Sequence, residues 1–233
     1  MHELSDFVRA PNQADDPGLY EVENAAMDPD GVLAAALWSA APWDGRDVLD
    51  LGCGSGYWLS SYRRRARSVL GVEPDRSLLP LAAARDASIP VVHGSAEHIP
   101  VPDAAVDVVH ARFAYFFPPD RDAGLAEVMR VLRPGGALVV VDNDQRWGEF
   151  AELLALSPWA APQGKAETTD MWWAERGAVR HEVHSSWRFP DRAGLEAVLR
   201  LEFSDDLATA WLGDHPGRHE LSYGYVLFVA TKR

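Results

Sequence analysis

Three glycines on alternate positions, Gly52, Gly54 and Gly56, are the residues best suited to contact a ligand. They directly follow an apolar run at 48–51, so the sequence predicts a buried strand that ends in a tight turn. Because glycine has no Cβ, such a turn lets a ligand lie directly against the main chain. Nucleotides bind at turns of this kind, and the neighbouring residues decide which nucleotide is bound.

Predicted strands and helices alternate around this turn. Most of the strands are apolar throughout, which is typical of a parallel sheet covered by helices on both faces. With right-handed crossovers, the pattern predicts an α/β fold with a doubly wound, mostly parallel, seven-stranded sheet. The predicted strands are 48–51, 68–72, 90–93, 106–110, 137–141, 179–189 and 221–230, and the predicted helices are 31–41, 57–65, 77–84, 121–132, 150–156, 169–176 and 191–201.

The length, composition and net charge of the chain disfavour several classes of protein. The chain has 233 residues, of which 47% are hydrophobic, and this suits one globular domain. A single cysteine, Cys53, allows no disulfide framework, so we expect a reducing, cytoplasmic location. The first residues lack the basic and apolar regions of a signal peptide, and no apolar run reaches the ~20 residues that span a membrane. A formal net charge of -13 disfavours nucleic acid as a partner.

Small, polar or acidic residues end five of the predicted strands, namely Gly52, Glu73, Ser95, His110 and Asp142. Ligands of a parallel sheet bind beyond the carboxyl ends of its strands, so these residues should meet at one ligand-binding edge. Glu73 follows Gly52 by 21 positions, where a carboxylate accepts hydrogen bonds from both hydroxyls of a bound ribose. A surface glutamate without a ligand is the alternative interpretation.

Two nucleotide-binding motifs do not fit this turn. The dinucleotide fingerprint needs a further glycine three positions after Gly54, where this chain has Tyr57. The phosphate-binding loop needs a glycine followed directly by lysine and then serine or threonine, and Gly56 is followed by Tyr57 instead. A nicotinamide-dependent dehydrogenase is therefore a disfavoured alternative.

An ordered set of segments carries a family resemblance. They are Val48-Leu49-Asp50-Leu51-Gly52-Cys53-Gly54-Ser55-Gly56, Glu73, Gly94-Ser95-Ala96-Glu97-His98-Ile99-Pro100-Val101-Pro102-Asp103 and Leu132-Arg133-Pro134-Gly135-Gly136. This set resembles class I S-adenosylmethionine-dependent methyltransferases, most closely the small-molecule branch that includes the ubiquinone/menaquinone-type enzymes. The similarity covers about residues 46–144 and, more weakly, the final predicted strand.

The resemblance implies a Rossmann-like methyltransferase fold with helical lid elements. It also implies S-adenosylmethionine as cofactor, S-adenosylhomocysteine as by-product, and direct displacement of the methyl group onto a small organic molecule. The acceptor atom is expected to be oxygen, nitrogen or carbon of an aromatic or polyketide-like compound. The cofactor-binding residues that it implies are Gly52, Cys53, Gly54, Gly56, Glu73, Pro74, Ser95, Ala96, Glu97, His110 and Ala111.

The chain departs from the family pattern at two places. The residue beside the adenine is usually aspartate, whereas this chain has Ser95, with Glu97 as a nearby substitute. Many relatives carry a Leu-His-His-like run after the fourth strand, whereas this chain has Tyr115-Phe116-Phe117. The second departure keeps an alternative open, in which the protein is a cofactor-dependent cyclase or decarboxylase, or a noncatalytic cofactor binder.

Residues that could catalyse the reaction are few. A direct displacement depends mainly on in-line approach in a desolvated pocket, and a base helps where the acceptor must lose a proton. His110 and Tyr115 are weak candidates for such a role, and core or aromatic packing is the competing interpretation of both. No metal site is expected, because His181 and His184 are three positions apart on a strand and point to opposite faces.

The chain is interpreted as a single structural domain in three consecutive parts. Residues 1–45 form an N-terminal helical segment, with a loop at 11–18, that is either a lid or a structural lead-in. Residues 46–144 form the cofactor-binding core, and residues 145–233 supply substrate-lid inserts and the final sheet strands, with a polar, turn-rich stretch after 201. We expect a monomer or homodimer. The substrate-lid candidates are Tyr20, Tyr115, Trp147, Trp172 and Trp173.

Overall fold

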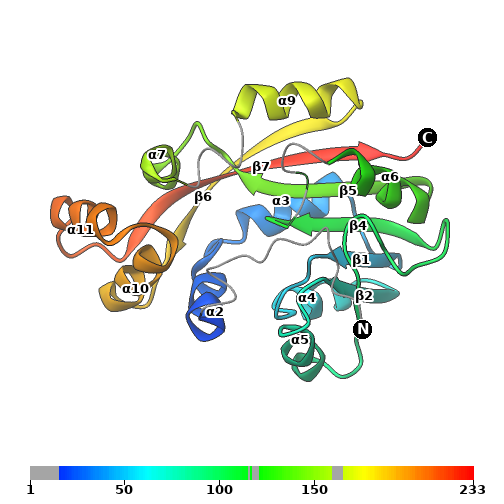
Figure 1. Ribbon diagram of the computed structural model, residues 1–233, viewed down its shortest axis with the longest axis horizontal. Helices are drawn as coiled ribbons and strands as arrows, with labels where there is room; N and C mark the ends of the chain where they lie inside the picture. The colour runs from blue at the N-terminus through cyan, green and yellow to red at the C-terminus, as the bar shows by residue number, and fades with distance from the viewer. Residues whose placement is uncertain (1–15, 115, 117–120, 159–164) are drawn as a thin grey trace.

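The structure is a computed structural model that describes residues 16–114, 116, 121–158 and 165–233. In this part of the chain, seven strands form one sheet in the order β3-β2-β1-β4-β5-β7-β6 (Figure 1). β1 to β5 pair in parallel, whereas β7 pairs antiparallel with both β5 and β6, so the predicted doubly wound, mostly parallel sheet is confirmed. The strands are β1 (Asp47–Leu51), β2 (Ser68–Glu73), β3 (Val91–His93), β4 (Val106–Arg112), β5 (Leu132–Asn143), β6 (Val179–Arg188) and β7 (Glu220–Thr231).

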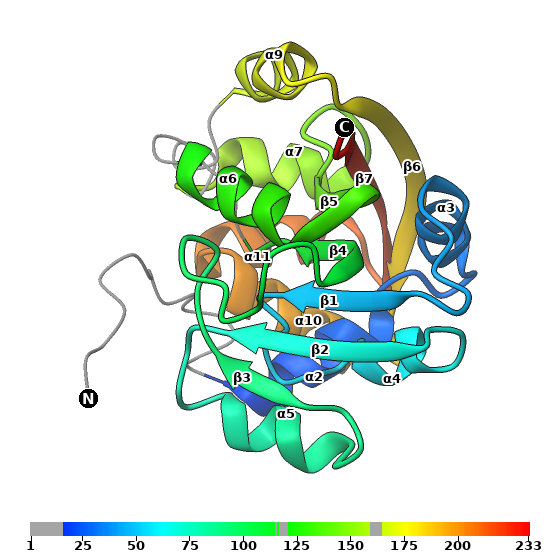
Figure 2. The ribbon, with the colours of Figure 1, turned by 90° about the vertical axis from the view of Figure 1, so that its right-hand side faces the viewer.

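Helices cover both faces of this sheet (Figure 2). One face is contacted by α3, α4 and α5, and the other by α6 and α9. α7 also packs on β7, and α2 contacts β6; together with α10 and α11 they gather on the side to which β4 and β5 point (Figure 1). The helices are α2 (Pro17–Ala26), α3 (Val32–Ala40), α4 (Leu59–Arg63), α5 (Leu79–Arg85), α6 (Asp122–Val131), α7 (Glu149–Leu156), α9 (Ala166–Glu175), α10 (Arg192–Glu202) and α11 (Asp205–Asp214).

β1 lies between β2 and β4, and its apolar residues are buried on both faces. Val48 packs into one core cluster and Leu49 into the other, as expected for side chains that alternate along a strand. At the end of β1, the amides of Gly52 and Cys53 donate to the Val72 carbonyl at 2.8 and 3.1 Å. The glycine turn is therefore held against the end of β2.

Two helices lie where the sequence predicted loops. α2 replaces the end of the predicted loop at 11–18, and residues 11–15 lie outside the described part of the chain. Asp16 caps α2 by accepting from the Leu19 amide at 2.9 Å. α11 replaces part of the predicted turn-rich stretch, and the Ser204 side chain caps it. The cap and the buried Trp211 and Leu212 are signals that the polar composition concealed.

β5 begins five residues earlier than predicted, at Leu132 rather than Ala137. Its first residues include Pro134, Gly135 and Gly136, which lie between the predicted helix at 121–132 and the predicted strand at 137–141. The Gly135 amide donates to the Lys232 carbonyl at 2.8 Å, and the Lys232 amide returns a bond to Gly136 at 2.9 Å. Pairing with the end of the chain therefore overrides the turn propensity of this segment.

None of the helices in the described residues is both long and apolar enough to cross a bilayer.

Candidate functional site

The glycine turn has a backbone that requires glycine. Gly52, Gly54 and Gly56 have φ values of +73°, +57° and +78°, in the left-handed region that L side chains avoid. A Cβ on Gly52 would lie 2.4 Å from the Ala114 Cβ, and a Cβ on Gly56 would lie 3.0 Å from the Ala82 Cα. Both the conformation and the close packing therefore exclude larger residues from positions 52 and 56.

Glu73 links the end of β2 to this turn. Its carboxylate is buried, with 4% of the residue exposed, and accepts from the Gly54 amide and the Asp75 amide, both at 2.7 Å. Burial raises the pKa of Glu73 to about 7, although the two amide bonds favour the ionised form. Each carboxylate oxygen has a second lone pair, so the group can hold the turn and still accept bonds from a ribose.

Other predicted cofactor residues lie at the same edge of the sheet. The Gly94 amide donates to the Glu73 carbonyl at 3.2 Å, which brings the segment Ser95-Ala96-Glu97 next to Glu73. Ala111 on β4 pairs with Leu51, the residue before the turn. Pro74 follows Glu73, and its carbonyl lies 3.1 Å from the His93 ring. The structure thus gathers these positions around one turn.

The thiol of Cys53 is buried. A Cβ on Gly71 would lie 2.8 Å from the Cys53 Sγ, so the sulfur points into the sheet interior. Burial raises the pKa of the thiol well above its usual value, which removes it as a nucleophile.

His110 does not fit the predicted catalytic role. Its side chain is fully buried, and its ring lies 5.3 Å from the Trp43 ring and 4.8 Å from the Tyr62 ring. Burial lowers the pKa of His110 to about 3, so the imidazole stays neutral. These contacts favour the competing interpretation, core packing, because the His110 ring lies on the face of β4 that α4 covers. Tyr115, the other catalytic candidate, lies outside the described residues.

Sequence reasoning missed Asp50, which pairs with His110 across β1 and β4. Asp50 is 3% exposed, and burial raises its pKa to about 7 against the opposing effect of the Arg112 charge. Arg112 donates to the Tyr62 hydroxyl at 2.8 Å. A carboxylate inside an otherwise apolar strand, two residues before the turn, was the signal that could have identified this residue.

α2 is bound directly to the glycine turn. Glu21 accepts a hydrogen bond from the Ser55 hydroxyl and forms an ion pair with Arg85. Arg85 also donates to the Ser55 carbonyl at 3.2 Å. Tyr20, the neighbouring lid candidate, lies within this helix. The N-terminal segment therefore packs against the predicted cofactor edge.

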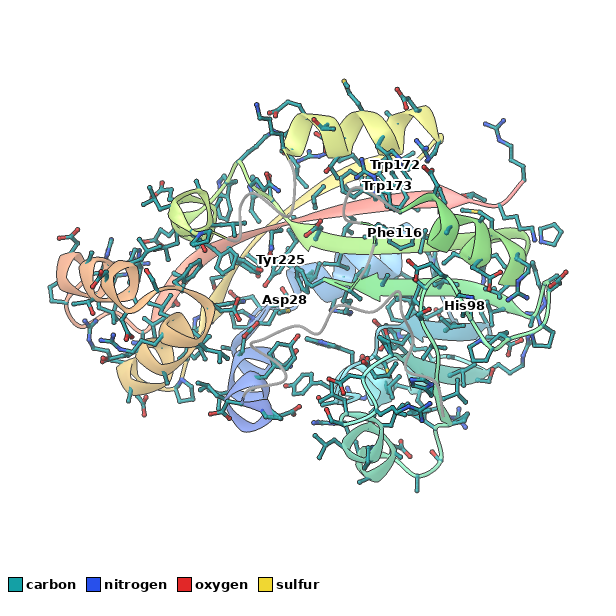
Figure 3. The ribbon with its side chains drawn as sticks, viewed as in Figure 1. Asp28, His98, Phe116, Trp172, Trp173 and Tyr225 are labelled. Atoms are coloured by element: carbon teal, nitrogen blue, oxygen red, sulfur yellow. The ribbon has the colours of Figure 1, made fainter. Side chains whose placement is uncertain are left out.

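The tryptophan candidates differ in their surroundings. Trp173 is 1% exposed and stacks on Phe228 at 5.3 Å, so it packs α9 onto the sheet and is wrongly assigned to a substrate lid (Figure 3). Trp172 lies between the guanidinium groups of Arg121 and Arg176, also in the packing of α9.

The third tryptophan, Trp147, is half-buried and stacks on the His184 ring at 4.0 Å. His184 is thus engaged by an aromatic ring. No group of three or more potential metal ligands occurs among the residues that the structure describes.

Part of the chain matches a known protein family. Residues 49–140 match the family model described as a methyltransferase domain. Residues 49–140 therefore form a class I S-adenosylmethionine-dependent methyltransferase domain. Its cofactor is S-adenosylmethionine, and the family resemblance assigns the glycine turn and Glu73 to the binding of that cofactor.

Relatives of the methyltransferase domain differ in the reaction that their names describe. The chain is 33% identical over 122 residues to a malonyl-[acyl-carrier protein] O-methyltransferase of Serratia marcescens, covering 52% of this chain and 47% of that protein. It is 28% identical over 195 residues to the ubiquinone/menaquinone biosynthesis C-methyltransferase UbiE of Rubrivivax gelatinosus, covering 79% of this chain and 69% of that protein. The chain thus spans about half the length of the first relative.

A solved structure shares the fold of the methyltransferase domain and its flanking elements. It is a putative methyltransferase from Bacillus halodurans, with a TM-score of 0.63 at 19% identity, covering 85% of this chain and 97% of that chain. At this identity the likeness bears on the fold, and the acceptor must be argued from the residues of this chain.

Proposed function

We propose that this protein transfers the methyl group of S-adenosylmethionine to a small organic molecule. The observation that carries the proposal is the left-handed glycine turn tied to the buried Glu73 carboxylate. When bound, the cofactor supplies an electrophilic methyl group on a sulfonium, and the sulfur leaves as a neutral thioether.

The residues at the edge suit the parts of this cofactor. Glu73 accepts hydrogen bonds from the ribose hydroxyls, and the Ser95-Ala96-Glu97 segment beside it contacts the adenine. The glycine turn lets the amino-acid end approach the main chain, with Asp50 and Ala111 close by. The carboxylates of Asp50 and Glu73 also give this edge negative charge, which complements the sulfonium.

The proposed partners follow from composition and fold. A net charge of -13 disfavours nucleic acid, and the single buried cysteine suits the cytoplasm. We propose a small-molecule substrate, no membrane or nucleic-acid partner, and a monomer or homodimer. The matching family model and the two relatives described above are all methyltransferases, which favours methyl transfer over a cyclase, a decarboxylase or a noncatalytic cofactor binder.

Transfer of a radiolabelled methyl group to a panel of phenols, amines, carboxylic acids and carbon acids tests this proposal. We expect labelled product from at least one class, formed in equal amount with S-adenosylhomocysteine. Saturable cofactor binding without transfer to any class would favour the noncatalytic alternative and contradict methyl transfer.

A further inference from the structure

Arg112, the last residue of β4, carries a positive charge without a carboxylate partner in the part of the chain that the structure describes. Its Nε donates to the Tyr62 hydroxyl at 2.8 Å, and its guanidinium carbon lies 4.3 Å from the centre of the Trp58 ring. These two contacts hold the side chain in place but do not neutralise it. By contrast, Arg67 and Arg130 form ion pairs with aspartates. The terminal nitrogens of Arg112 are therefore donors without an acceptor among the described residues.

Two carboxylates on this face of the sheet do not neutralise Arg112. Asp50 pairs with His110, two residues before Arg112, so the side chains of Asp50 and Arg112 share a face. The two nevertheless form no ion pair in the described structure. Asp28 lies before α3, which packs on the same face, and it accepts from two α3 amides at 2.8 and 2.9 Å and from the Ser185 hydroxyl at 3.0 Å. The guanidinium charge is thus left for a bound anion.

The Tyr225 hydroxyl is a second donor without an acceptor on this face. Arg112 pairs with Val141 of β5, which pairs with Leu227 of β7, and Tyr225 is two residues from Leu227, so its side chain points to the same face. Tyr225 is 0% exposed, and its hydroxyl has no hydrogen-bond partner among the described residues. The indole N–H of Trp187 near it is a donor only and does not accept the hydroxyl proton. Because native proteins rarely leave buried polar atoms unpaired, this hydroxyl points to a ligand that accepts hydrogen bonds.

Phe113, the residue after Arg112, connects the two donors. Its φ of +49° lies in the left-handed region, which a bulky residue rarely adopts. Its amide donates to the Val141 carbonyl at 2.9 Å, and its ring lies 6.2 Å from the Tyr225 ring. Backbone conformations of this kind concentrate at ligand-binding and active sites. The chain therefore turns sharply at the end of β4 and brings the segment that carries Arg112 against Tyr225.

The two donors lie away from the predicted ribose contact. The sheet order places β1 between β2, which carries Glu73, and β4, which carries Arg112. Tyr225, on β7, lies two strands further along, on the same side of the sheet as α2 (Figure 3). The proposed contacts of the adenosine half of the cofactor are at Glu73 and the segment after β3. The two donors are therefore free for the other reactant, the methyl acceptor.

We propose that Arg112 and Tyr225 bind a carboxylate group of the methyl acceptor, which makes the acceptor an organic acid. This inference rests on the proposed methyl transfer. A carboxylate has two oxygens, which can accept from the terminal nitrogens of Arg112 and from the Tyr225 hydroxyl. A neutral acceptor would leave the half-buried guanidinium group without a counter-charge, which costs free energy. The rings of Trp58, Phe113 and Tyr225 beside these donors suit an aromatic or other flat apolar body on the same molecule.

The acceptor class is tested by calorimetric titration of the full chain loaded with S-adenosylhomocysteine. The probes are 4-hydroxyphenylacetate and indole-3-acetate, each compared with its primary amide, which has the same shape without the charge. We expect the acids to bind about tenfold or more tightly than the amides. Equal binding of acid and amide, or binding of neither, would overturn the carboxylate assignment, and retained S-adenosylhomocysteine binding separates that outcome from failure of the cofactor site. Acid binding without labelled methyl transfer to any acceptor would support the carboxylate site and contradict the proposed function.

Two variants test the residues themselves. Arg112→Gln removes the charge, and we expect the Kd of the acids to rise about 10–150-fold while the Kd of the amides changes little. Tyr225→Phe removes only the hydroxyl, and the Kd of the acids should rise about 10-fold. The control is Arg200→Gln, because Arg200 forms an ion pair with Glu196 on α10, and it should leave all of these values unchanged. Unchanged acid affinity in either Arg112→Gln or Tyr225→Phe would refute the proposal, and if a variant fails to fold, the comparison of acids with amides on the wild-type protein decides.

A second source of a carboxylate is the cofactor itself, and the Arg112→Gln variant distinguishes the two sources. S-adenosylhomocysteine carries a carboxylate, whereas 5′-methylthioadenosine has the same nucleoside without it. We expect Arg112→Gln to bind both compounds with the affinity of the wild-type protein. A loss of S-adenosylhomocysteine affinity with unchanged 5′-methylthioadenosine affinity would assign Arg112 to the cofactor and overturn its assignment to the acceptor.

Discussion

Replacing Glu73 by glutamine should weaken both the ligand-free fold and cofactor binding. Glu73 accepts two main-chain amides at 2.7 Å in a buried position. Glutamine keeps one oxygen but turns an amide donor toward the second N–H group, so one charged hydrogen bond is lost. A hydrogen bond to a charged group contributes about 1.5–3 kcal/mol, which is the expected loss in the free energy of unfolding. The ribose loses its ionic acceptor as well, so the S-adenosylhomocysteine Kd should rise about 10–150-fold.

Denaturant unfolding and calorimetric titration measure these two effects separately. Asp47→Asn is the matched control, because it removes a carboxylate at the opposite end of β1. Asp47 accepts from Arg67 at 2.8 Å and from Arg133 at 2.9 Å, so this variant should also lose stability. It should bind S-adenosylhomocysteine with unchanged affinity. Unchanged affinity in Glu73→Gln would refute the assignment of Glu73 to the ribose.

Further predictions concern the turn, the core and two carboxylates. Gly52→Ala should weaken S-adenosylhomocysteine binding by roughly tenfold or more in calorimetric titration, because the new Cβ would lie 2.4 Å from the Ala114 Cβ. The control is Gly45→Ala, where φ is +66° and the space around the Cβ is open. This control should lower the free energy of unfolding by about 1 kcal/mol and leave the affinity for S-adenosylhomocysteine unchanged. Trp173→Ala should cost about 3–5 kcal/mol in denaturant unfolding, and a loss below about 1 kcal/mol would argue against its core position. Burial raises the pKa of Glu73 to about 7, so its carboxylate is ionised above that pH. The affinity for S-adenosylhomocysteine, measured by calorimetric titration, should therefore fall as the pH drops through about 7. The fall should be smaller in Glu73→Gln. Arg67 and Arg133 hold the pKa of Asp47 below its value in the unfolded chain. The ionised Asp47 therefore stabilises the fold above pH about 4, and this stabilisation should be lost on acidification. Acid unfolding of the wild-type protein should show this loss, and acid unfolding of Asp47→Asn should not.

The parallel core of the fold could be predicted from the sequence because its signals are local. Apolar runs and the residues that end them predicted β1 and β2 to within two residues. α11 was missed because its polar first turn resembles a loop, while its cap at Ser204 is a subtle signal. The start of β5 was missed for another reason, since its pairing partner, Lys232, is about 100 residues away along the chain.

In the candidate site too, some features follow from local sequence signals and others depend on contacts between distant parts of the chain. The positions of Gly52 and Glu73 follow from the order of strands, because the carboxyl ends of parallel strands meet at one edge. The direction of a side chain depends on tertiary packing, so the sequence left the role of His110 open although it predicted the strand that carries this residue.

Calorimetric titration of the protein with S-adenosylhomocysteine and with NAD tests the central claim most directly. We predict saturable one-site binding of S-adenosylhomocysteine and no binding of NAD, because Tyr57 replaces the third glycine that a dinucleotide requires. Absence of S-adenosylhomocysteine binding, or saturable binding of NAD at the glycine turn, would contradict the account.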